Sequence, residues 1–161
     1  MNRSFKRTVG LLFLLLSALS CLSCSFINNF VVVNGSREAL EVTYHVKKPT
    51  DPRAPTRLYE RAPETKPLSQ VDQQAWQQVP PSRYKIDAEN RTVVLTLNPD
   101  EALLLTQCRP ANGQTSGDCE TDNFQIDEIG LVGVNGETKL KGEQAHKSFV
   151  QNRNTYILTY Y

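Results

Sequence analysis

The chain has 161 residues, of which 18 are basic and 17 acidic, and 39% are hydrophobic. A formal net charge of +1 provides no concentrated basic surface of the kind that nucleic-acid phosphates require, so the composition argues against a nucleic-acid partner. The length suits one domain with its own hydrophobic core.

The N-terminal segment has a basic start, a short apolar middle and small residues at its end. Arg3, Lys6 and Arg7 precede an apolar run over 10–19, and residues 1–9 contain no acidic side chain. This order is typical of a cleaved export signal. The run is shorter than the stretch of about 20 apolar residues that a membrane-spanning helix needs. We therefore expect residues 1–20 to direct export and then to be removed.

The end of this segment resembles the lipobox of bacterial lipoproteins, in which a small residue directly precedes an invariant cysteine. Ala18-Leu19-Ser20-Cys21 matches the looser form of that pattern, with Ala18 where Leu is commoner, and Cys24 is a second candidate. The resemblance covers only the N-terminal segment. It implies diacylglyceryl attachment to the cysteine sulfur and cleavage before it, and two or three acyl chains anchor a protein stably. Cys21 is the expected acceptor and Cys24 the alternative.

The residue after the lipidated cysteine bears on localisation. In Gram-negative lipoproteins an Asp at that position retains the protein at the inner membrane, and here the residue is Leu22, or Ser25 for the alternative. The resemblance therefore implies a lipid-anchored protein of the outer membrane, facing the periplasm, in a Gram-negative host. A Gram-positive host would place it on the outer face of its single membrane.

Removal of the signal changes the charge of the remaining chain. Three of the 18 basic residues and none of the 17 acidic ones precede Cys21, so the remainder carries a net charge of about −2, which again disfavours nucleic acid. The expected organisation is a signal peptide over 1–20, a lipid-anchored linker over 21–27 and one folded domain over 28–161.

Strand patterns dominate the expected domain. Apolar and polar residues alternate over 40–47, and the preceding apolar run ends at Asn34-Gly35, so residues 29–47 are expected to form a hairpin. Further strands are predicted over the following ranges: 91–97, 102–107, 123–134, 137–141 and 155–161. Turns are predicted at 98–100 and 134–136, and Gly142 is expected to end the strand before it.

Eight or nine short strands without a convincing amphipathic helix predict an all-β fold. We expect an antiparallel, immunoglobulin-like β-sandwich. A closed lipocalin-like barrel is the second choice, because the early Gly-x-Trp signature of that family is missing. The single tryptophan, Trp76, is expected to anchor a loop to the core.

Residues 47–67 form a separate segment that holds five of the nine prolines and six basic residues against three acidic ones. Because proline withholds backbone donors, this segment is not expected to be an internal strand. It is expected to be a solvated surface excursion. If it binds anything, it would dock an acidic or peptide partner through four side chains: Arg53, Arg57, Tyr59 and Arg61.

Cys108 and Cys119 enclose a segment of turn-forming residues, RPANGQTSGD. In an oxidising compartment such a pair is expected to form a disulfide. A bridge across so short a loop contributes roughly 3 kcal/mol on the chain-entropy model.

The chain shows few candidates for catalysis or metal binding. His45 is expected on the outward side of its strand and His146 in a polar turn. An acidic cluster follows the cysteine loop but lacks the spacing of a calcium loop, so a solvated surface is expected; its members are Asp118, Glu120, Asp122, Asp127 and Glu128. No metal site, no cofactor and no enzymatic activity are predicted.

The function expected from these features is that of a non-enzymatic binding or structural module, anchored by lipid in the cell envelope and engaging a protein or envelope partner. One alternative is an inhibitor of an exogenous hydrolase that inserts the loop 108–119. The other is an envelope hydrolase whose site combines His45 or His146 with the acidic cluster.

Overall fold

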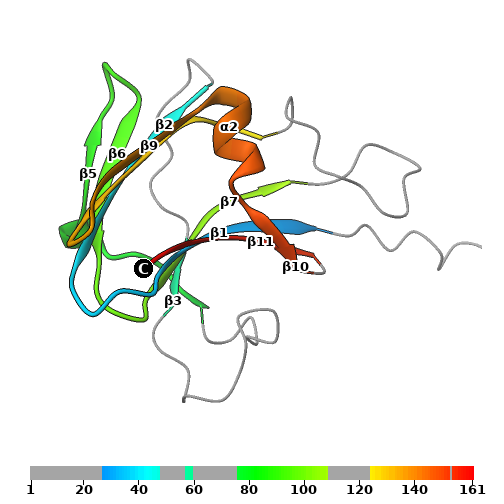
Figure 1. Cartoon of the computed structure of the whole chain (residues 1–161). Coiled ribbons are helices and arrows are strands. Elements are labelled where there is room, and N and C mark those ends of the chain that lie inside the picture. The colour runs from blue at the N-terminus through cyan, green and yellow to red at the C-terminus, as the bar shows by residue number, and fades with distance from the viewer. Residues whose placement is uncertain (1–26, 48–56, 60–75, 109–123, 153) are drawn as a thin grey trace, which may run out of the picture.

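The computed structural model describes residues 27–47, 57–59, 76–108, 124–152 and 154–161, and these form two β-sheets facing each other (Figure 1). Sheet A contains, in spatial order, β10 (Val150–Asn152), β11 (Thr155–Tyr160), β1 (Asn28–Asn34), β7 (Ala102–Cys108), β3 (Arg57–Tyr59) and β4 (Trp76–Gln77). Sheet B contains β5 (Tyr84–Asp87), β6 (Thr92–Leu97), β2 (Leu40–Val46), β8 (Ile126–Gly133) and β9 (Gly136–Lys141). A 3-10 turn, η3 (Pro81–Arg83), and a short helix, α2 (Gly142–Lys147), complete the described elements.

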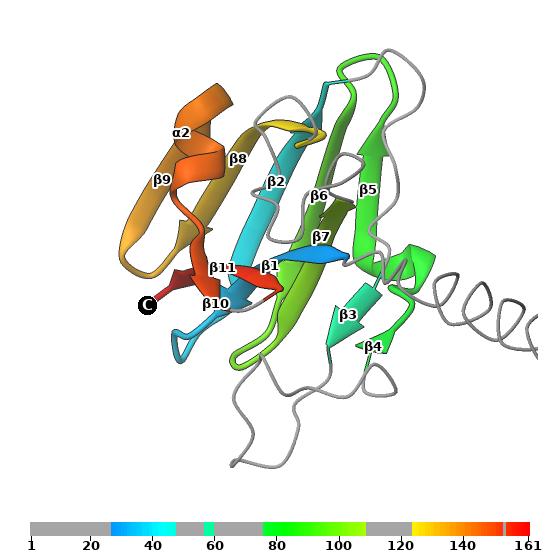
Figure 2. The ribbon, with the colours of Figure 1, turned by 90° about the vertical axis from the view of Figure 1, so that its right-hand side faces the viewer.

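The two sheets confirm the predicted all-β sandwich, and the barrel alternative is wrong because the sheets do not close on each other (Figures 1 and 2). All described pairings are antiparallel except that of β1 with β11. The alternation predicted over 40–46 is confirmed, since Leu40, Val42, Tyr44 and Val46 are buried. Each fully buried apolar side chain of this size stabilises the fold by roughly 1.5–3 kcal/mol.

Aromatic rings fill one end of the core between the sheets. The ring of Phe30 in β1 stacks on that of Tyr156 in β11, with centroids 4.6 Å apart. Phe124 and Phe149 pack against Phe30 at 4.8 and 5.2 Å. The same rings thus connect the first and last strands to the segment that follows α2, which is why residues distant in sequence form a single core.

Sheet A also has an apolar outer face, turned away from sheet B. Val31, Ala102 and Leu104 form a second buried cluster there, and Val33 and Trp76 pack against it. Trp76, which was expected to anchor a loop to the core, instead begins strand β4 and packs against this second cluster. Because β1 is buried on both faces, its sequence is a continuous apolar run rather than an alternating one.

The hairpin predicted over 29–47 is wrong, because β1 belongs to sheet A and β2 to sheet B. The turn at Asn34-Gly35 carries the chain across the sandwich instead. Similarly, the turn after β6 takes the chain from sheet B to β7 in sheet A. The two crossings meet, since the backbone N–H of Asn34 donates to the carbonyl of Glu101 at 3.0 Å and that of Asp100 donates to the carbonyl of Asn34 at 2.9 Å. The turn predicted at 134–136 does form the β8–β9 hairpin.

Two further expectations were wrong. β3 lies between β7 and β4, so residues 57–59 form an internal strand within the proline-rich segment. No proline falls within these three residues, which leaves their backbone N–H groups available for pairing. Gly142 ends β9 as predicted, but its φ of +52° leads into α2 rather than into a polar turn.

An ion pair between Arg83 and Glu101 stabilises the turn that takes the chain from β6 in sheet B to β7 in sheet A. The Glu101 carboxylate accepts hydrogen bonds from both terminal nitrogens of Arg83, at 2.9 and 2.6 Å. It also accepts bonds from the backbone N–H and the side-chain amide of Asn98, at 2.8 and 3.1 Å. Burial by itself would raise the pKa of Glu101, but these hydrogen bonds outweigh it and lower the pKa below the usual 4.5.

This lowered pKa predicts a specific acid sensitivity. Above pH 4.5 the carboxylate is ionised in both the folded and the unfolded chain, and its contribution to stability is fully present. As the pH falls through the lowered pKa of the folded state, that contribution is lost. In Glu101→Gln, the free energy of unfolding should therefore fall less steeply over this acidic range than in the parent chain.

Urea unfolding at a series of pH values measures this difference. The exposed Glu89 offers a matched control, since Glu89→Gln removes a carboxylate that forms no ion pair with the described residues and should leave the pH profile unchanged. A Glu101→Gln profile parallel to that of the parent chain would contradict the assignment.

Candidate functional site

Most of the site residues predicted from the sequence lie outside the described residues: Cys21, Cys24, Arg53, Arg61 and Cys119. Arg57 begins β3 and is exposed, and Tyr59 ends the same strand opposite Trp76. Cys108 is the buried last residue of β7. The Cys108–Cys119 disulfide, the lipid acceptor and the four-residue docking surface therefore stay predictions, as does the role of the loop 108–119 in the inhibitor alternative.

His45 lies on the outer face of sheet B, as predicted. Its Nδ1 is 3.6 Å from a carboxylate oxygen of Asp127, whose side chain is 53% exposed. The β2–β8 register shifts after His45, so that Asp127 is skipped in the pairing and a bulge brings it beside the histidine. The distance exceeds the 2.6–3.2 Å of a catalytic hydrogen bond, and the open setting gives no water-excluded cleft.

His146 contributes to the core rather than to a polar turn. Its ring lies 5.6 Å from that of Phe30 and 5.4 Å from that of Phe124, measured between centroids. Its Nε2 is buried and has no hydrogen-bond partner among the described residues. The histidine therefore packs as an aromatic ring against the core.

Of the two described members of the acidic cluster, Asp127 lies beside His45 and Glu128 is paired with lysines. Glu128 accepts Lys139 Nζ at 2.7 Å and Lys141 Nζ at 2.9 Å, both from β9. The hydrogen bonds from Lys139 and Lys141 lower the pKa of Glu128. Within the described ranges, no three His, Cys, Asp or Glu side chains come close enough to hold a metal ion.

The two edge strands of sheet B, β5 and β9, carry charged side chains. Lys85 and Asp87 lie on β5, while Glu137, Lys139 and Lys141 lie on β9. Charged side chains on edge strands oppose pairing with other chains. The β10–β11 edge of sheet A differs, since Val150–Asn152 and Thr155–Tyr160 contain no acidic or basic residue.

β11 is only partly paired on the side of β10. On its other side it pairs with β1 along its whole length, from Asn29↔Thr155 to Asn34↔Tyr160. β10, however, pairs only with Thr155–Ile157. Among the described residues, no strand pairs with Leu158–Tyr160 on that side.

The pairing of β11 with β1 shows to which side of β11 the backbone N–H and C=O of each residue point. The carbonyls of Asn154 and Tyr160 accept hydrogen bonds from Asn29 and Gly35, at 2.9 and 2.7 Å, so even-numbered residues direct their backbone groups toward β1. Successive residues of a strand direct these groups to opposite sides. The N–H and C=O of Thr159 therefore point to the open side.

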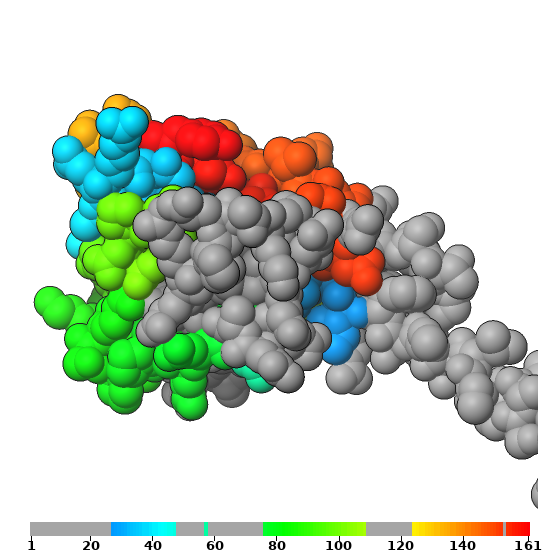
Figure 3. All heavy atoms as spheres, turned by 90° about the horizontal axis from the view of Figure 1, so that it is seen from below, coloured from blue at the N-terminus to red at the C-terminus, as the bar shows by residue number. Residues whose placement is uncertain are grey.

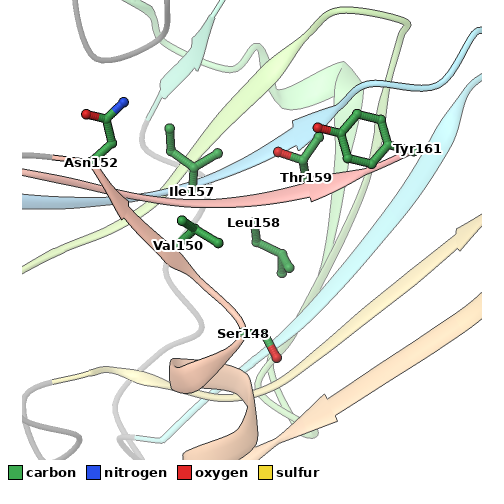
Figure 4. Close-up of a pocket in the computed structure, with 7 residues that line it drawn as sticks. All are labelled: Ser148, Val150, Asn152, Ile157, Leu158, Thr159 and Tyr161. Carbon is green, nitrogen blue, oxygen red and sulfur yellow. The ribbon is translucent and has the colours of Figure 1, made fainter.

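A groove of about 400 Å³ adjoins this open stretch. Its lining side chains come from β10, β11 and the residues flanking them, and Figure 4 shows them around the two strands: Ser148, Val150, Asn152, Ile157, Leu158, Thr159 and Tyr161. Val150 is 73% exposed and Tyr161 77% exposed. Figure 3 shows the orange and red C-terminal part of the chain on the molecular surface.

The groove continues the apolar outer face of sheet A. In the β1–β11 register, Val31 lies beside Ile157 and Val33 beside Thr159, so the second apolar cluster reaches the groove through adjacent side chains. This site is not among those predicted from the sequence. The signal available in the sequence was the absence of charge over residues 154–161, while the exposure of Val150 on a short strand is known only from the structure.

No family model matches the chain, and neither the curated proteins nor the solved structures include a significant match to it. In the described part of the chain, no helix is both long and apolar enough to cross a membrane.

Proposed function

We propose that this protein is a non-enzymatic binding module of the bacterial cell envelope, exported and then anchored through a lipid on Cys21. The N-terminal sequence supports export and anchoring. The observation that carries the binding role is the uncharged, partly unpaired edge of β11 with its adjoining groove. Natural sheets usually protect such edges, so an edge left open and uncharged favours a role in recognition.

The two histidines give little support to the hydrolase alternative. The solvated His45–Asp127 pair lies on sheet B, and the His146 ring packs against the aromatic side chains of the core. A reaction assisted by a general base would need one of them beside a nucleophile within a cleft. We accordingly propose no catalytic step, and reproducible turnover of a peptidase, glycosidase or esterase substrate that one point mutation abolishes would contradict this.

Lipid anchoring can be tested by metabolic labelling of the full chain with palmitate in bacteria. We expect Cys24→Ala to retain the label and Cys21→Ala to lose it, because the lipid is attached to the sulfur of the acceptor cysteine. Cys21→Ala should also keep its N-terminal segment, which mass spectrometry detects. The two variants control for each other, since each removes one cysteine from the same segment.

Labelling that survives Cys21→Ala and is lost in Cys24→Ala would move the acceptor to Cys24. Labelling that survives in the double variant would contradict lipid anchoring at this segment altogether. Membrane fractionation of the labelled chain then tests the proposed outer-membrane, periplasm-facing location in a Gram-negative host.

A further inference from the structure

We infer that the open edge of β11 binds an extended segment of a partner protein, which adds a strand beside Leu158–Tyr160 and places uncharged side chains in the adjoining groove. The inference rests on the proposed binding function and deepens it by naming the kind of partner and the strand that receives it.

The backbone geometry specifies an extended partner. Thr159 presents one N–H and one C=O on the side where the β10 ladder has ended. A strand laid along this side would make hydrogen bonds with both groups, as in other cases of strand addition to a sheet edge. A helix or a folded loop would not present backbone donors and acceptors at the spacing of a strand.

The side chains specify the chemistry of that segment. Alternate residues of an added strand would lie on the outer face of sheet A, beside Val150 and Ile157. The described lining of the groove carries no acidic or basic group, so a charged side chain placed there would lose water without gaining an ion pair. Small apolar and uncharged polar side chains are therefore the ones this groove accepts.

The extent of the open edge limits the strength of the interaction. Three residues of β11 lie beyond the β10 ladder, which allows a short run of backbone pairing. The groove volume of about 400 Å³ is near the lower end of the 300–1,000 Å³ found for small-ligand pockets. Such a site suits a peptide segment rather than a large folded surface.

Amide hydrogen exchange, followed by NMR on the full chain purified in detergent, tests the open edge directly. In the free protein the amide of Thr159 should exchange faster than the amides of Leu158 and Tyr160, which face β1. Equal protection of all three amides in a monomeric chain would overturn the inference. If Thr159 is protected and the chain sediments as a dimer, the edge pairs with a second copy of itself, which also overturns a separate peptide partner.

A displayed library of random linear peptides, selected on the same full chain, supplies the probe. The selected peptides should be uncharged with alternating apolar residues, and binding should slow exchange at Thr159. Val150→Lys places a charge in the groove at a side chain already 73% exposed, so the fold should tolerate it. It should weaken peptide binding by about tenfold or more.

Val132→Lys is the matched control. It makes the same substitution at a 45% exposed side chain of β8, on the outer face of sheet B, and should bind the selected peptides as the parent chain does. The inference would be overturned if charged peptides were selected or if the two variants changed peptide affinity equally. It would also be overturned if peptide binding left the exchange rate of the Thr159 amide unchanged. Peptide binding that survives Val150→Lys would leave a binding module whose site lies elsewhere, whereas loss of palmitate labelling would count against the anchoring alone.

Discussion

Replacing Asn34 by aspartate is expected to destabilise the fold by about 3 kcal/mol or more, because it disrupts a fully satisfied buried amide. Asn34 is completely buried where the chain crosses from β1 to β2. Its Nδ2 donates to the carbonyls of Glu38 and Leu97, at 2.7 and 3.0 Å. Its Oδ1 accepts from the backbone N–H and the hydroxyl of Ser36, at 3.1 and 2.7 Å.

Aspartate has nearly the same shape but would turn an oxygen toward both carbonyls. Each of those carbonyls would lose its donor, and an ionised carboxylate would be held in the protein interior against two negative partial charges. Equilibrium unfolding in urea measures the loss. Ser36→Ala is the matched control, since it removes one hydroxyl from the same network and should cost about 1 kcal/mol. A stability of Asn34→Asp within experimental error of the parent chain would contradict the role given to this side chain.

Gly133→Ala is expected to destabilise the protein by about 2–3 kcal/mol through overpacking. A Cβ at Gly133 would lie 2.6 Å from Cε1 and 2.9 Å from Cζ of Tyr160. The ring cannot move away freely, because its hydroxyl accepts from the backbone N–H of Asn135 at 2.9 Å and donates to the carbonyl of Gly136 at 3.0 Å. Tyr160 thereby connects the last strand of sheet A to the β8–β9 turn of sheet B.

Gly130→Ala provides the comparison within the same strand. There a Cβ would meet Thr43 Cβ at 3.6 Å, an ordinary contact, so alanine should be neutral or slightly stabilising through a less flexible unfolded chain. Thermal unfolding of both variants separates steric overlap from a general effect of glycine replacement. Combining Gly133→Ala with Tyr160→Phe should cost less than the sum of the two changes, because the ring without its hydroxyl can shift. Equal melting temperatures for the two alanine variants would refute the packing argument.

The sequence predicted local structure better than the arrangement of strands in space. Alternation over 40–46 identified a half-buried strand, and Asn135-Gly136 identified a true hairpin, because both signals depend on neighbouring residues. The same kind of signal at Asn34-Gly35 was misleading. The side chain of Asn34 bonds to residues of the crossing and to the distant Leu97, which local pattern does not reveal.

The candidate site was missed for a related reason. Residues 155–161 were predicted as a strand, but whether a strand is internal or open depends on the lengths of its neighbours. β10 has three residues and β11 six, and this mismatch leaves Thr159 unpaired on one side among the described strands. The core position of His146 likewise depends on Phe30 and Phe124, which are far from it in sequence.

The parallel pairing of β1 with β11 has a consequence for how the chain acquires its structure. These strands open and close the described part of the molecule, so the β1–β11 pairing cannot form until residues 155–160 are available. Contacts that span so much sequence slow folding, because a long loop must close before they form. During synthesis β1 can therefore pair with β7 before it pairs with β11, and sheet A is completed only when the last described strand has been made.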